Sequence, residues 1–242
     1  MNLAIDIGNS FVKLAAIDNG KVIKKGKAEK FTQRFYKTII GQEKVDGIVL
    51  SSTRKSDERM LRFLKKQALF VNLDHKTKIP IKNAYKTPKT LGKDRLAAAI
   101  GAFKLYPKTN CLIIDVGTCM TYDFLDRKGN YMGGNIAPGI ELRYRAMDEF
   151  TARLPLVKRS YTGQLFGQST KSALQNGGLM GVIFEIEGFI GRLKQIYKNK
   201  INIILTGGDA EYLAEHIKTQ IFVHSDLVLI GLNTILEHNL YD

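Results

Sequence analysis

The chain has few of the residues that stabilise small exported proteins or bind transition metals. Its 242 residues include only two cysteines, Cys111 and Cys119, in or beside apolar segments. This argues against a disulfide framework, and we expect reduced, partly buried thiols. The four histidines show no paired metal-ligand spacing, which argues against a zinc site. No apolar run reaches the roughly 18 residues that a membrane span needs, and the N-terminus has neither a basic leader nor an apolar signal core. We therefore expect a cytoplasmic protein without a membrane partner.

Acidic residues are also few relative to basic ones. The chain has 23 Asp and Glu against 37 Lys and Arg, which gives a formal net charge of +14. Such a balance suits nucleic acids or anionic small substrates. The lysines are spread along the chain, however, and no basic stretch is interleaved with aromatic residues in the manner of an RNA-binding sheet. Nucleic-acid binding is the disfavoured alternative, because anionic substrates or a solvated basic surface explain the charge as well.

Apolar residues, which make up 44% of the chain, alternate between strand-like and helix-like periods. This alternation is typical of an α/β architecture. The segment 76–90 contains prolines and no period, so a loop is expected there. Strands are expected at 3–7, 11–17, 46–53, 68–73, 201–206 and 221–224 and from 112 onwards, and helices at 31–41, 55–67, 91–106, 168–197 and 227–239.

A short arrangement of polar residues occurs twice, once near the start of each half of the chain. In both places an apolar strand ends at an aspartate, a glycine follows two residues later, and a second strand begins after a small polar residue. The coinciding positions, at one constant offset, are Asp6 and Asp115, Gly8 and Gly117, Asn9 and Thr118, and Gly20 and Gly129. Either copy alone could be a plain hairpin turn. Because strand, turn, strand and turn all recur in order, the pattern indicates a duplication.

The chemistry of this repeated turn suits phosphate. A glycine without a Cβ lets the backbone approach a ligand closely, and backbone N–H groups with Asn, Ser or Thr side chains donate to phosphate oxygens. The aspartate would need a bridging cation beside a phosphate. Two such turns facing each other across a cleft could hold one polyphosphate. Other phosphate motifs are missing: residues 20–28 have the wrong spacing for a P-loop, and no G-x-G-x-x-G follows a strand.

With these motifs the sequence resembles the superfamily of sugar kinases, acetate kinase, actin and heat-shock chaperone ATPases. Within it, the resemblance to type III pantothenate kinases covers nearly the whole chain. That family shows D-x-G-N-[TS]-x-x-K, G-x-D-R, D-x-G-T-x-x-T and G-G-x-I-x-P-G in this order. The matching segments here are 6–13, 92–95, 115–121 and 133–139, and residues 167–181, 206–210 and 226–233 also fit the family pattern.

The resemblance implies a duplicated ribonuclease-H-like, actin-like ATPase fold with lobes at 1–110 and 111–242 and a central cleft. It implies ATP-dependent phosphorylation of pantothenate to 4'-phosphopantothenate, the first step of coenzyme A biosynthesis, with Mg²⁺ and a monovalent cation, K⁺ or NH₄⁺. It also implies a homodimer with the pantothenate pocket close to the interface, in agreement with the apolar helix at 179–197. The alternatives are an ATPase or a sugar or acetate kinase on the same fold, and a nucleic-acid-binding transcriptional accessory protein.

For ATP, the resemblance implies contacts from residues 6–13 and a second phosphate contact from Thr118. Lys13 could neutralise phosphate charge, although it could also be an ordinary surface lysine. Asp115 resembles the ligand of the monovalent cation, and Asp6 the organiser of Mg²⁺. The sequence itself does not separate these two roles. The ATP-binding residues implied are Asp6, Ile7, Gly8, Asn9, Ser10, Phe11, Val12, Lys13 and Thr118.

For the substrate, the resemblance assigns the pantothenate hydroxyl to Asp94, and phosphoryl transfer needs positioning more than a strong base. A carboxylate in the first turn of a helix can also simply complement the helix dipole. Arg95 and helix N–H groups suit a carboxylate, although Arg95 could be a salt-bridge partner, Tyr85 a loop anchor and Thr170 a helix cap. The substrate-binding residues implied are Tyr85, Gly92, Lys93, Asp94, Arg95 and Thr170.

The chain departs from the family pattern at two positions beside the predicted phosphate contacts. Ser10 stands where the family usually has threonine, which keeps the hydroxyl group. Cys119 stands where the family usually has alanine, and we interpret it as a small packing residue whose alkylation could block the site.

Overall fold

The computed structural model describes residues 1–54, 57–198 and 200–240. Their packing forms two units. The first unit consists of Met1–Cys111, Asp123–Gly133 and Asp226–Asp242, and the second of Leu112–Tyr122 and Gly134–Ser225. The predicted halves, 1–110 and 111–242, refer to the sequence repeat. They remain a prediction about that duplication, because the first packed unit also contains two segments of the second half, Asp123–Gly133 and Asp226–Asp242.

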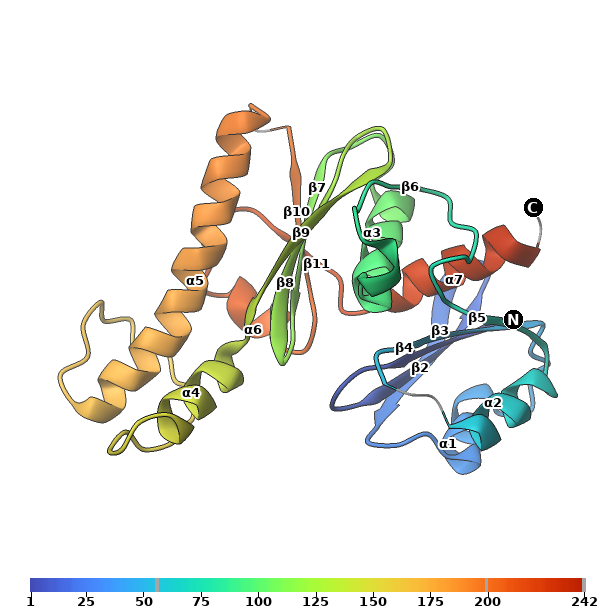
Figure 1. The fold of residues 1–242 in the computed structure, drawn as a ribbon, viewed down its shortest axis with the longest axis horizontal. Helices are drawn as coiled ribbons and strands as arrows, with labels where there is room; N and C mark the ends of the chain where they lie inside the picture. The colour runs from blue at the N-terminus through green and yellow to red at the C-terminus, as the bar shows by residue number, and fades with distance from the viewer. Residues whose placement is uncertain (55–56, 199, 241–242) are drawn as a thin grey trace. The chain divides into compact units, whose positions relative to one another are not determined.

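A five-stranded sheet forms the centre of the first unit, in the order β3-β2-β1-β4-β5. β1 pairs antiparallel with β2 and parallel with β4. β1 and β4 are buried almost throughout, because helices cover the two faces of the sheet: α1 and α2 on one side and α7 on the other (Figure 1). The bounds are β1 Asn2–Ile7, β2 Val12–Asp18, β3 Lys21–Ala28, α1 Gln33–Ile40, β4 Gly47–Ser52, α2 Glu58–Lys65, β5 Leu69–Asn72 and α7 Leu227–Leu240.

Two glycines let helix α3 (Lys93–Leu105) pack backbone to backbone on α7. A Cβ on Gly231 would lie 1.8 Å from the carbonyl oxygen of Ala97, and one on Gly101 would lie 2.3 Å from that of Leu227. Such separations are far below van der Waals contact, so only glycine fits at these positions. This packing fixes α3, whose first turn carries the predicted substrate residues.

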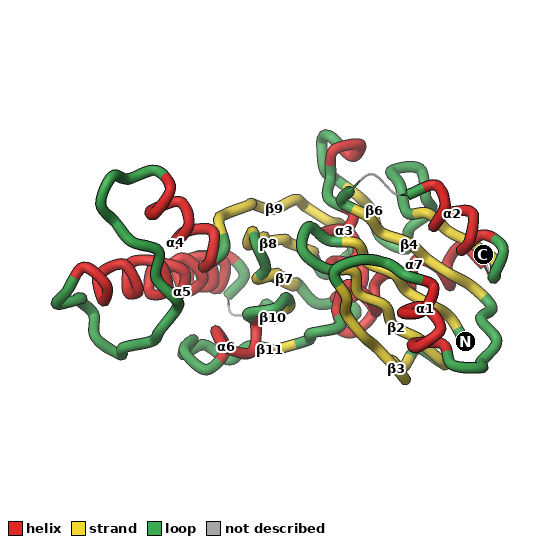
Figure 2. The backbone as a smooth tube through the Cα atoms, turned by 90° about the horizontal axis from the view of Figure 1, so that it is seen from below, coloured by secondary structure: helices red, strands yellow, loops and turns green. Residues whose placement is uncertain are grey.

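The second unit is built on a sheet with the order β11-β10-β7-β8-β9-β6, most of whose strands are seen side by side in Figure 2. The bounds are β7 Cys111–Val116, β8 Cys119–Leu125, β9 Asn130–Pro138, β10 Asn202–Thr206 and β11 Phe222–Val223, with the short β6 at Lys82–Asn83. The hairpin end that joins β8 to β9, residues 123–133, belongs to the first unit, where Lys82 and Asn83 pair with Asn130 and Tyr131.

Three helices complete the second unit: α4 Ile140–Glu149, α5 Thr170–Ile196 and α6 Ala210–Ala214. α5 lies on the sheet, where Phe189 stacks on Tyr122 with 4.3 Å between ring centroids. α4 packs on α5 where Tyr144 covers Gly178 and donates a hydrogen bond from its hydroxyl to the Gln175 carbonyl, 3.0 Å away. The long apolar helix predicted at 168–197 is confirmed.

Two expectations about local structure need correction. The segment 76–90 is not entirely loop, because it contains β6 and a short 3-10 helix at Pro88–Thr90. Cys119 is exposed, unlike the buried Cys111, because it begins β8 at the turn after Gly117; its interpretation as a packing residue is wrong. The helix predicted at 55–67 begins on residues 55–56, which lie outside the described residues, and within the rest of this range α2 runs from Glu58 to Lys65.

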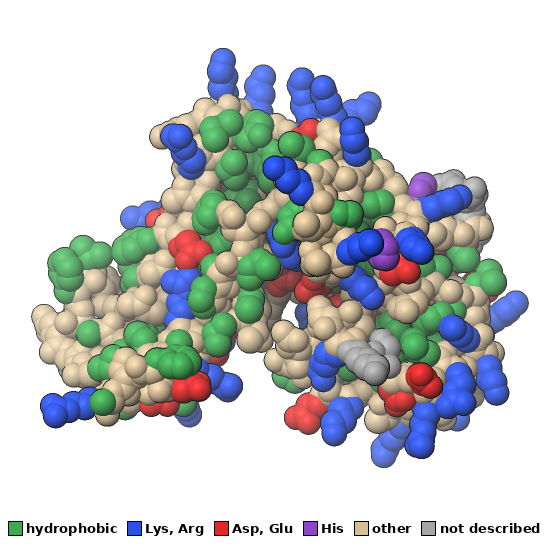
Figure 3. Space-filling model, viewed as in Figure 1, with side chains coloured by type: hydrophobic (Ala, Val, Ile, Leu, Met, Phe, Trp, Pro, Cys, Tyr) green, Lys and Arg blue, Asp and Glu red, His purple; other side chains and the backbone are tan. Residues whose placement is uncertain are grey.

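The sequence raised two questions that the structure addresses: whether a helix could span a membrane, and how the basic side chains are distributed. Within the described part of the chain, no helix is long and apolar enough to cross a membrane. Lys and Arg side chains are scattered over the face shown in Figure 3 rather than gathered in one stripe.

Candidate active site

The first predicted phosphate turn lies at the end of β1 in the first unit. Asp6 is only 6% exposed, although it is charged in its ordinary state. It lies opposite Lys13 in the pair with β2 and opposite Ser51 in the pair with β4. One carboxylate oxygen of Asp6, Oδ1, is buried and has no hydrogen-bond partner among the described residues. A buried carboxylate oxygen in this state needs a ligand or a proton.

The surroundings of Asp6 favour its protonated form. Burial raises the pKa of Asp6 from 3.8 to about 6; Lys13 opposes this shift, the nearby negative charge of Asp94 adds to it, and Ser51 opposes it. The effect of Asp94 shows that the first phosphate turn and the predicted catalytic aspartate belong to one electrostatic environment within the first unit. A cation at this position would relieve the repulsion between the two carboxylates.

The loop after β1 is held by the segment that follows β4. The Gly8 N–H donates to the Phe11 carbonyl at 3.0 Å and closes the turn. Arg54 donates from Nε to the Gly8 carbonyl at 2.6 Å, and Thr53 donates from both its backbone N–H and its hydroxyl to the Ile7 carbonyl. Asn9 remains exposed, as do Ser10 and Phe11. The loop is therefore pinned at its base while its tip stays accessible.

Thr53 and Arg54 were not predicted as site residues. The available signal was their position, because they follow directly on β4, the strand that runs parallel to β1. Parallel strands end at the same edge of a sheet, so the residues after β4 meet those after β1.

The first turn of α3 presents the predicted substrate residues. Gly92 is the N-cap and supplies no side-chain hydrogen bond to the helix. Asp94 Oδ1 accepts the N–H of Arg95 at 2.9 Å. This carboxylate therefore interacts with the N-terminal end of the helix, as expected if it complements the helix dipole. Asp94 and Lys93 are partly exposed. A helix N-terminus with unpaired N–H groups attracts anions, so the turn combines an anion-binding end with a carboxylate.

Arg95 points into the first unit and is buried against β8. It is 6% exposed and pairs with Asp123, which is 0% exposed. Its Nη2 lies 2.7 Å from Asp123 Oδ1 and its Nε 3.0 Å from the same oxygen. Tyr131 donates its hydroxyl to Asp123 Oδ1 at 2.6 Å. Burial lowers the pKa of Arg95, and the hydrogen bonds and charge of Asp123 more than reverse this, so the net shift is upward.

Tyr85 completes this buried group on the side of the loop before α3. Its ring centroid lies 5.8 Å from the Arg95 Cζ and 6.2 Å from the ring of Tyr131. The sequence predicted Tyr85 and Arg95 as substrate residues but gave no role to Asp123 or Tyr131. The available signal was Asp123 itself, the one charged residue of β8, because a buried charge requires a partner.

The second predicted phosphate turn lies between β7 and β8 in the second unit. The Gly117 N–H donates to the carbonyl of Cys119, two residues on, at 3.1 Å, whereas the Gly8 N–H of the first phosphate turn donates to a carbonyl three residues on, and the Gly139 N–H donates to the Thr118 carbonyl at 3.0 Å. A Cβ on Gly207 would lie 2.5 Å from Asp115 Oδ1 and 2.4 Å from the Val116 carbonyl oxygen. Glycines from two further motifs thus allow neighbouring segments to pack tightly against this turn.

Thr170 also lies in the second unit, as the first residue of α5, and is exposed. The helix cap is its neighbour Ser169, whose hydroxyl accepts the Ser172 N–H at 3.2 Å. The alternative that Thr170 itself caps the helix is therefore wrong, and its side chain is available for another role.

No group of three or more His, Cys, Asp or Glu side chains in the described residues could hold a metal ion. The residues at the first predicted phosphate turn, after β1, nevertheless fit a magnesium ion brought by a polyphosphate. Such ions usually retain waters and take one or two carboxylates with substrate oxygens, and the buried Asp6 Oδ1 without a partner is an oxygen of this kind.

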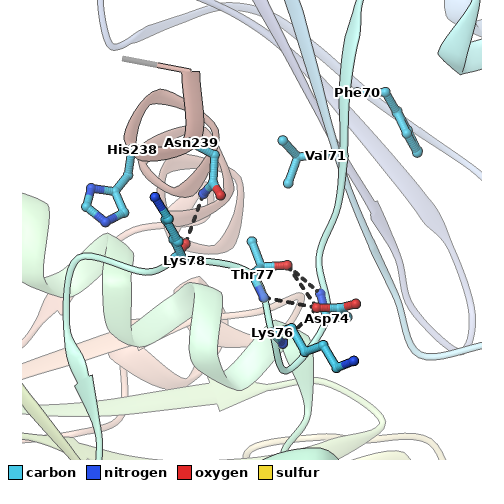
Figure 4. A pocket seen from close by; sticks show the side chains of 8 residues that line it. All are labelled: Phe70, Val71, Asp74, Lys76, Thr77, Lys78, His238 and Asn239. Carbon is cyan, nitrogen blue, oxygen red and sulfur yellow. Dashed lines mark hydrogen bonds between the residues drawn. The ribbon is translucent and has the colours of Figure 1, made fainter. Parts of the chain in front are cut away.

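An open pocket of about 390 Å³ lies elsewhere in the first unit (Figure 4). Asp74 closes a tight turn by accepting the backbone N–H groups of Lys76 and Thr77, and the amide of Asn239 donates to the Lys78 carbonyl. The sequence predicts no site there. Its lining residues are Phe70, Val71, Asp74, Lys76, Thr77, Lys78, His238 and Asn239.

The fold defines the class of the protein, the actin-like ATPase fold that the sequence predicted. A Campylobacter jejuni structure described as a Baf family transcriptional activator aligns with a TM-score of 0.65 at 22% identity, covering 98% of each chain. Component A of the Acidaminococcus fermentans (R)-2-hydroxyglutaryl-CoA dehydratase aligns with a TM-score of 0.55 at 13% identity, also over 98% of each chain. Both show the fold alone.

Sequence comparison then gives the family. The family model for type III pantothenate kinase matches residues 2–192. A type III pantothenate kinase of Cytophaga hutchinsonii is 41% identical over 99% of this chain and 100% of its own length. Another from Phocaeicola vulgatus is 39% identical over 99% of each chain. The chain belongs to the type III pantothenate kinase family, as its motifs predicted.

Proposed function

We propose that Asp94 orients the primary hydroxyl of pantothenate for attack on ATP. The reaction is the one that family membership assigns: ATP-dependent formation of 4'-phosphopantothenate, the first step of coenzyme A biosynthesis. The observation that supports this role is the position of Asp94, partly exposed at the N-terminal end of α3 and close enough to Asp6 to raise the pKa of that buried carboxyl.

In this reaction the pantothenate hydroxyl oxygen bonds to the γ-phosphorus while the bond from that phosphorus to the bridging oxygen of ADP breaks. The Asp94 carboxylate accepts the hydroxyl hydrogen and directs a lone pair at phosphorus. In a loose transition state this positioning matters more than basicity. The backbone N–H of Arg95, which Asp94 Oδ1 accepts, helps to hold this carboxylate in one orientation.

Residues 6–13 are proposed to contact the phosphates of ATP. The exposed Asn9 and Ser10 offer donors at the tip of a loop that the Gly8 N–H closes and Arg54 pins at its base, and Lys13 provides a positive charge opposite Asp6. Magnesium would neutralise the phosphate charge that develops during transfer, and Asp6 would hold it directly or through water. Thr118 is proposed as a second phosphate contact, since it occupies the position in the second copy of the motif that Asn9 occupies in the first.

Asp115 is proposed to hold a monovalent cation, K⁺ or NH₄⁺. Its carboxylate oxygen and the Val116 carbonyl oxygen both approach Gly207, and oxygen atoms of these two kinds are ligands for hard cations. Turnover measured in matched potassium, ammonium and sodium buffers tests this role. Equal turnover in all three would contradict it.

The pantothenate carboxylate end is proposed to bind at the first turn of α3, with donors from Arg95, Lys93 and the helix N–H groups following Gly92. Tyr85, next to the Arg95 guanidinium, would line the same pocket. Thr170, whose hydroxyl is not needed as the helix cap, would contact pantothenate from α5.

A homodimer is the proposed assembly, and the exposed apolar side chains of the second unit support it. Phe184 on α5 is 49% exposed, and the α4–α5 connection exposes Phe150 at 79% and Phe166 at 78%. If these large apolar side chains form one surface, such a surface is unusual on a protein without a partner. Sedimentation of the wild type and of Phe184→Glu tests the assembly; a wild-type monomer would contradict it. The relatives are bacterial metabolic enzymes, and we propose that this one acts in the cytoplasm.

The activity is tested by ADP release from ATP with pantothenate, a panel of sugars, acetate, or no acceptor. Release that depends on pantothenate is expected. Release with sugar or acetate but not with pantothenate would indicate another kinase of the same fold, and release without an acceptor would indicate an ATPase.

A further inference from the structure

A buried ion pair lies directly behind the first turn of α3, and its acidic member comes from a distant part of the chain. Asp123 on β8 is 0% exposed and accepts two hydrogen bonds from Arg95, through Nε and Nη2, at one oxygen. The second oxygen, Oδ2, lies 3.3 Å from Nε. This fork geometry restrains the guanidinium in one plane.

The pair is extended by a tyrosine from β9. The Tyr131 hydroxyl donates to Asp123 Oδ1 at 2.6 Å. Burial and the negative charge of Asp123 raise the pKa of Tyr131, so this hydroxyl keeps its hydrogen and remains a donor. The Tyr131 ring also lies 6.2 Å from that of Tyr85. Asp123 and Tyr131 thus contact, respectively, the Arg95 head group and the Tyr85 ring.

A buried ion pair is poor at stabilising a fold, because removing two charges from water costs about as much as their attraction returns. Burying the pair is more readily understood if the orientation of Arg95 matters. Arg95 follows Asp94 directly, and its side chain packs near Gly92, where an added Cβ would lie 3.4 Å from the Arg95 Cδ and 2.6 Å from Asp94 Oδ1. The orientation of Arg95 therefore affects the shape of the whole first turn.

We propose that Asp123 and Tyr131 are positioning residues for pantothenate: they hold Arg95 and Tyr85 in the orientations that bind the substrate. The inference rests on the proposed function of the α3 turn. Asp123 neutralises the Arg95 charge and leaves a guanidinium whose remaining donors are fixed in direction. Tyr131 supplies the hydrogen bond that keeps Asp123 from rotating. The ATP-binding loop after β1 is held by Thr53 and Arg54 instead, so this network should affect one substrate more than the other.

The decisive variant is Tyr131→Phe, which removes one hydroxyl and keeps the ring. We expect the KM for pantothenate to rise about three- to tenfold, because only part of the free energy of one hydrogen bond to a charged group is lost from substrate binding. The KM for ATP should change less than twofold. Asp123→Asn should raise the pantothenate KM further, because it leaves the buried guanidinium without its counter-charge. Direct binding of pantothenate, measured calorimetrically, should weaken in parallel.

Two control variants separate positioning from general loss of stability. Tyr36→Phe removes the hydroxyl of another buried tyrosine in the first unit, and Asp126→Asn alters a carboxylate that only closes the β8–β9 turn through Lys128 and Asn130. Both should leave the two KM values unchanged, even where they lower the melting temperature. If Asp123→Asn does not fold, Tyr131→Phe still decides the question.

The outcomes are distinguishable. Equal changes in the KM for pantothenate and for ATP, or none in Tyr131→Phe, would overturn the positioning role while leaving the proposed function intact. Wild-type protein that neither binds pantothenate nor phosphorylates it would overturn the proposed function, and this inference with it.

Discussion

Asp6 lies directly opposite Lys13 where the antiparallel strands β1 and β2 approach the first phosphate turn. The cationic side chain offsets only part of the cost of burying the carboxyl group, whose pKa is still raised to about 6 by burial and by the additional repulsion of Asp94. The turn without nucleotide is therefore short of positive charge on its inner side. A metal ion carried by ATP would supply that charge.

The first prediction concerns stability against pH without nucleotide or divalent metal. Between about pH 4 and pH 6, native Asp6 keeps a proton that the unfolded chain has lost, because its native pKa of about 6 exceeds the ordinary 3.8. Stability should therefore fall as pH rises through this window, by about 3 kcal/mol in all. Asp6→Asn should be more stable than the wild type at pH 7 and nearly equal at pH 4, as measured by urea unfolding in EDTA. Asp148→Asn, which removes an exposed carboxylate on α4, is the control. Parallel stability curves for wild type and Asp6→Asn would contradict the prediction.

The second prediction concerns Lys13. Lys13→Met should lower kcat/KM for ATP about ten- to hundredfold, the loss expected for one charge-assisted contact to phosphate. Lys24→Met on the exposed strand β3 removes the same charge and should change this value less than twofold. Steady-state kinetics at saturating pantothenate make the comparison. Equal kinetics in the two variants would return Lys13 to the role of an ordinary surface lysine.

The third prediction tests the packing that fixes α3. Gly231→Ala would place a Cβ 1.8 Å from the Ala97 carbonyl oxygen, so α7 must move away from α3, and we expect a destabilisation of about 3 kcal/mol or more. Gly188→Ala on α5 meets nothing within 4 Å and should stabilise by about 0.5–1 kcal/mol through helix propensity. Chemical unfolding of both variants provides the measurement. A Gly231→Ala protein as stable as the wild type would show that the close approach of the two helices is not required.

The turn residues could be predicted from sequence because their chemistry is local. An aspartate, a glycine and a small polar residue between two strands form a recognisable unit, and the second copy at Asp115 distinguishes it from a chance turn. The long helix α5 was equally accessible, since apolar residues recur at the helical period from Leu179 to Leu193.

The support of the site could not be predicted, because it depends on contacts between distant segments. Asp123 meets Arg95 only because the β8–β9 hairpin packs into the first unit, and no local pattern encodes that pairing. Arg54 reaches Gly8 because β4 runs parallel to β1. The exposure of Cys119 likewise follows from its place as the first residue of β8, next to the turn, whereas the apolar residues around it suggested burial.

The central claim is that Asp94 orients the hydroxyl of pantothenate, and one comparison tests it most directly. Pantothenate-dependent ADP release is measured for the wild type, Asp94→Asn and Asp57→Asn. Asp57 is the matched control, since it lies at the start of α2 in the same unit and accepts the Arg59 N–H at 2.8 Å. Loss of a positioned general base predicts a kcat lower by about 10² to 10⁴ in Asp94→Asn, with an unchanged melting temperature and normal turnover in Asp57→Asn. Asp94→Asn turning over at the wild-type rate would contradict the claim.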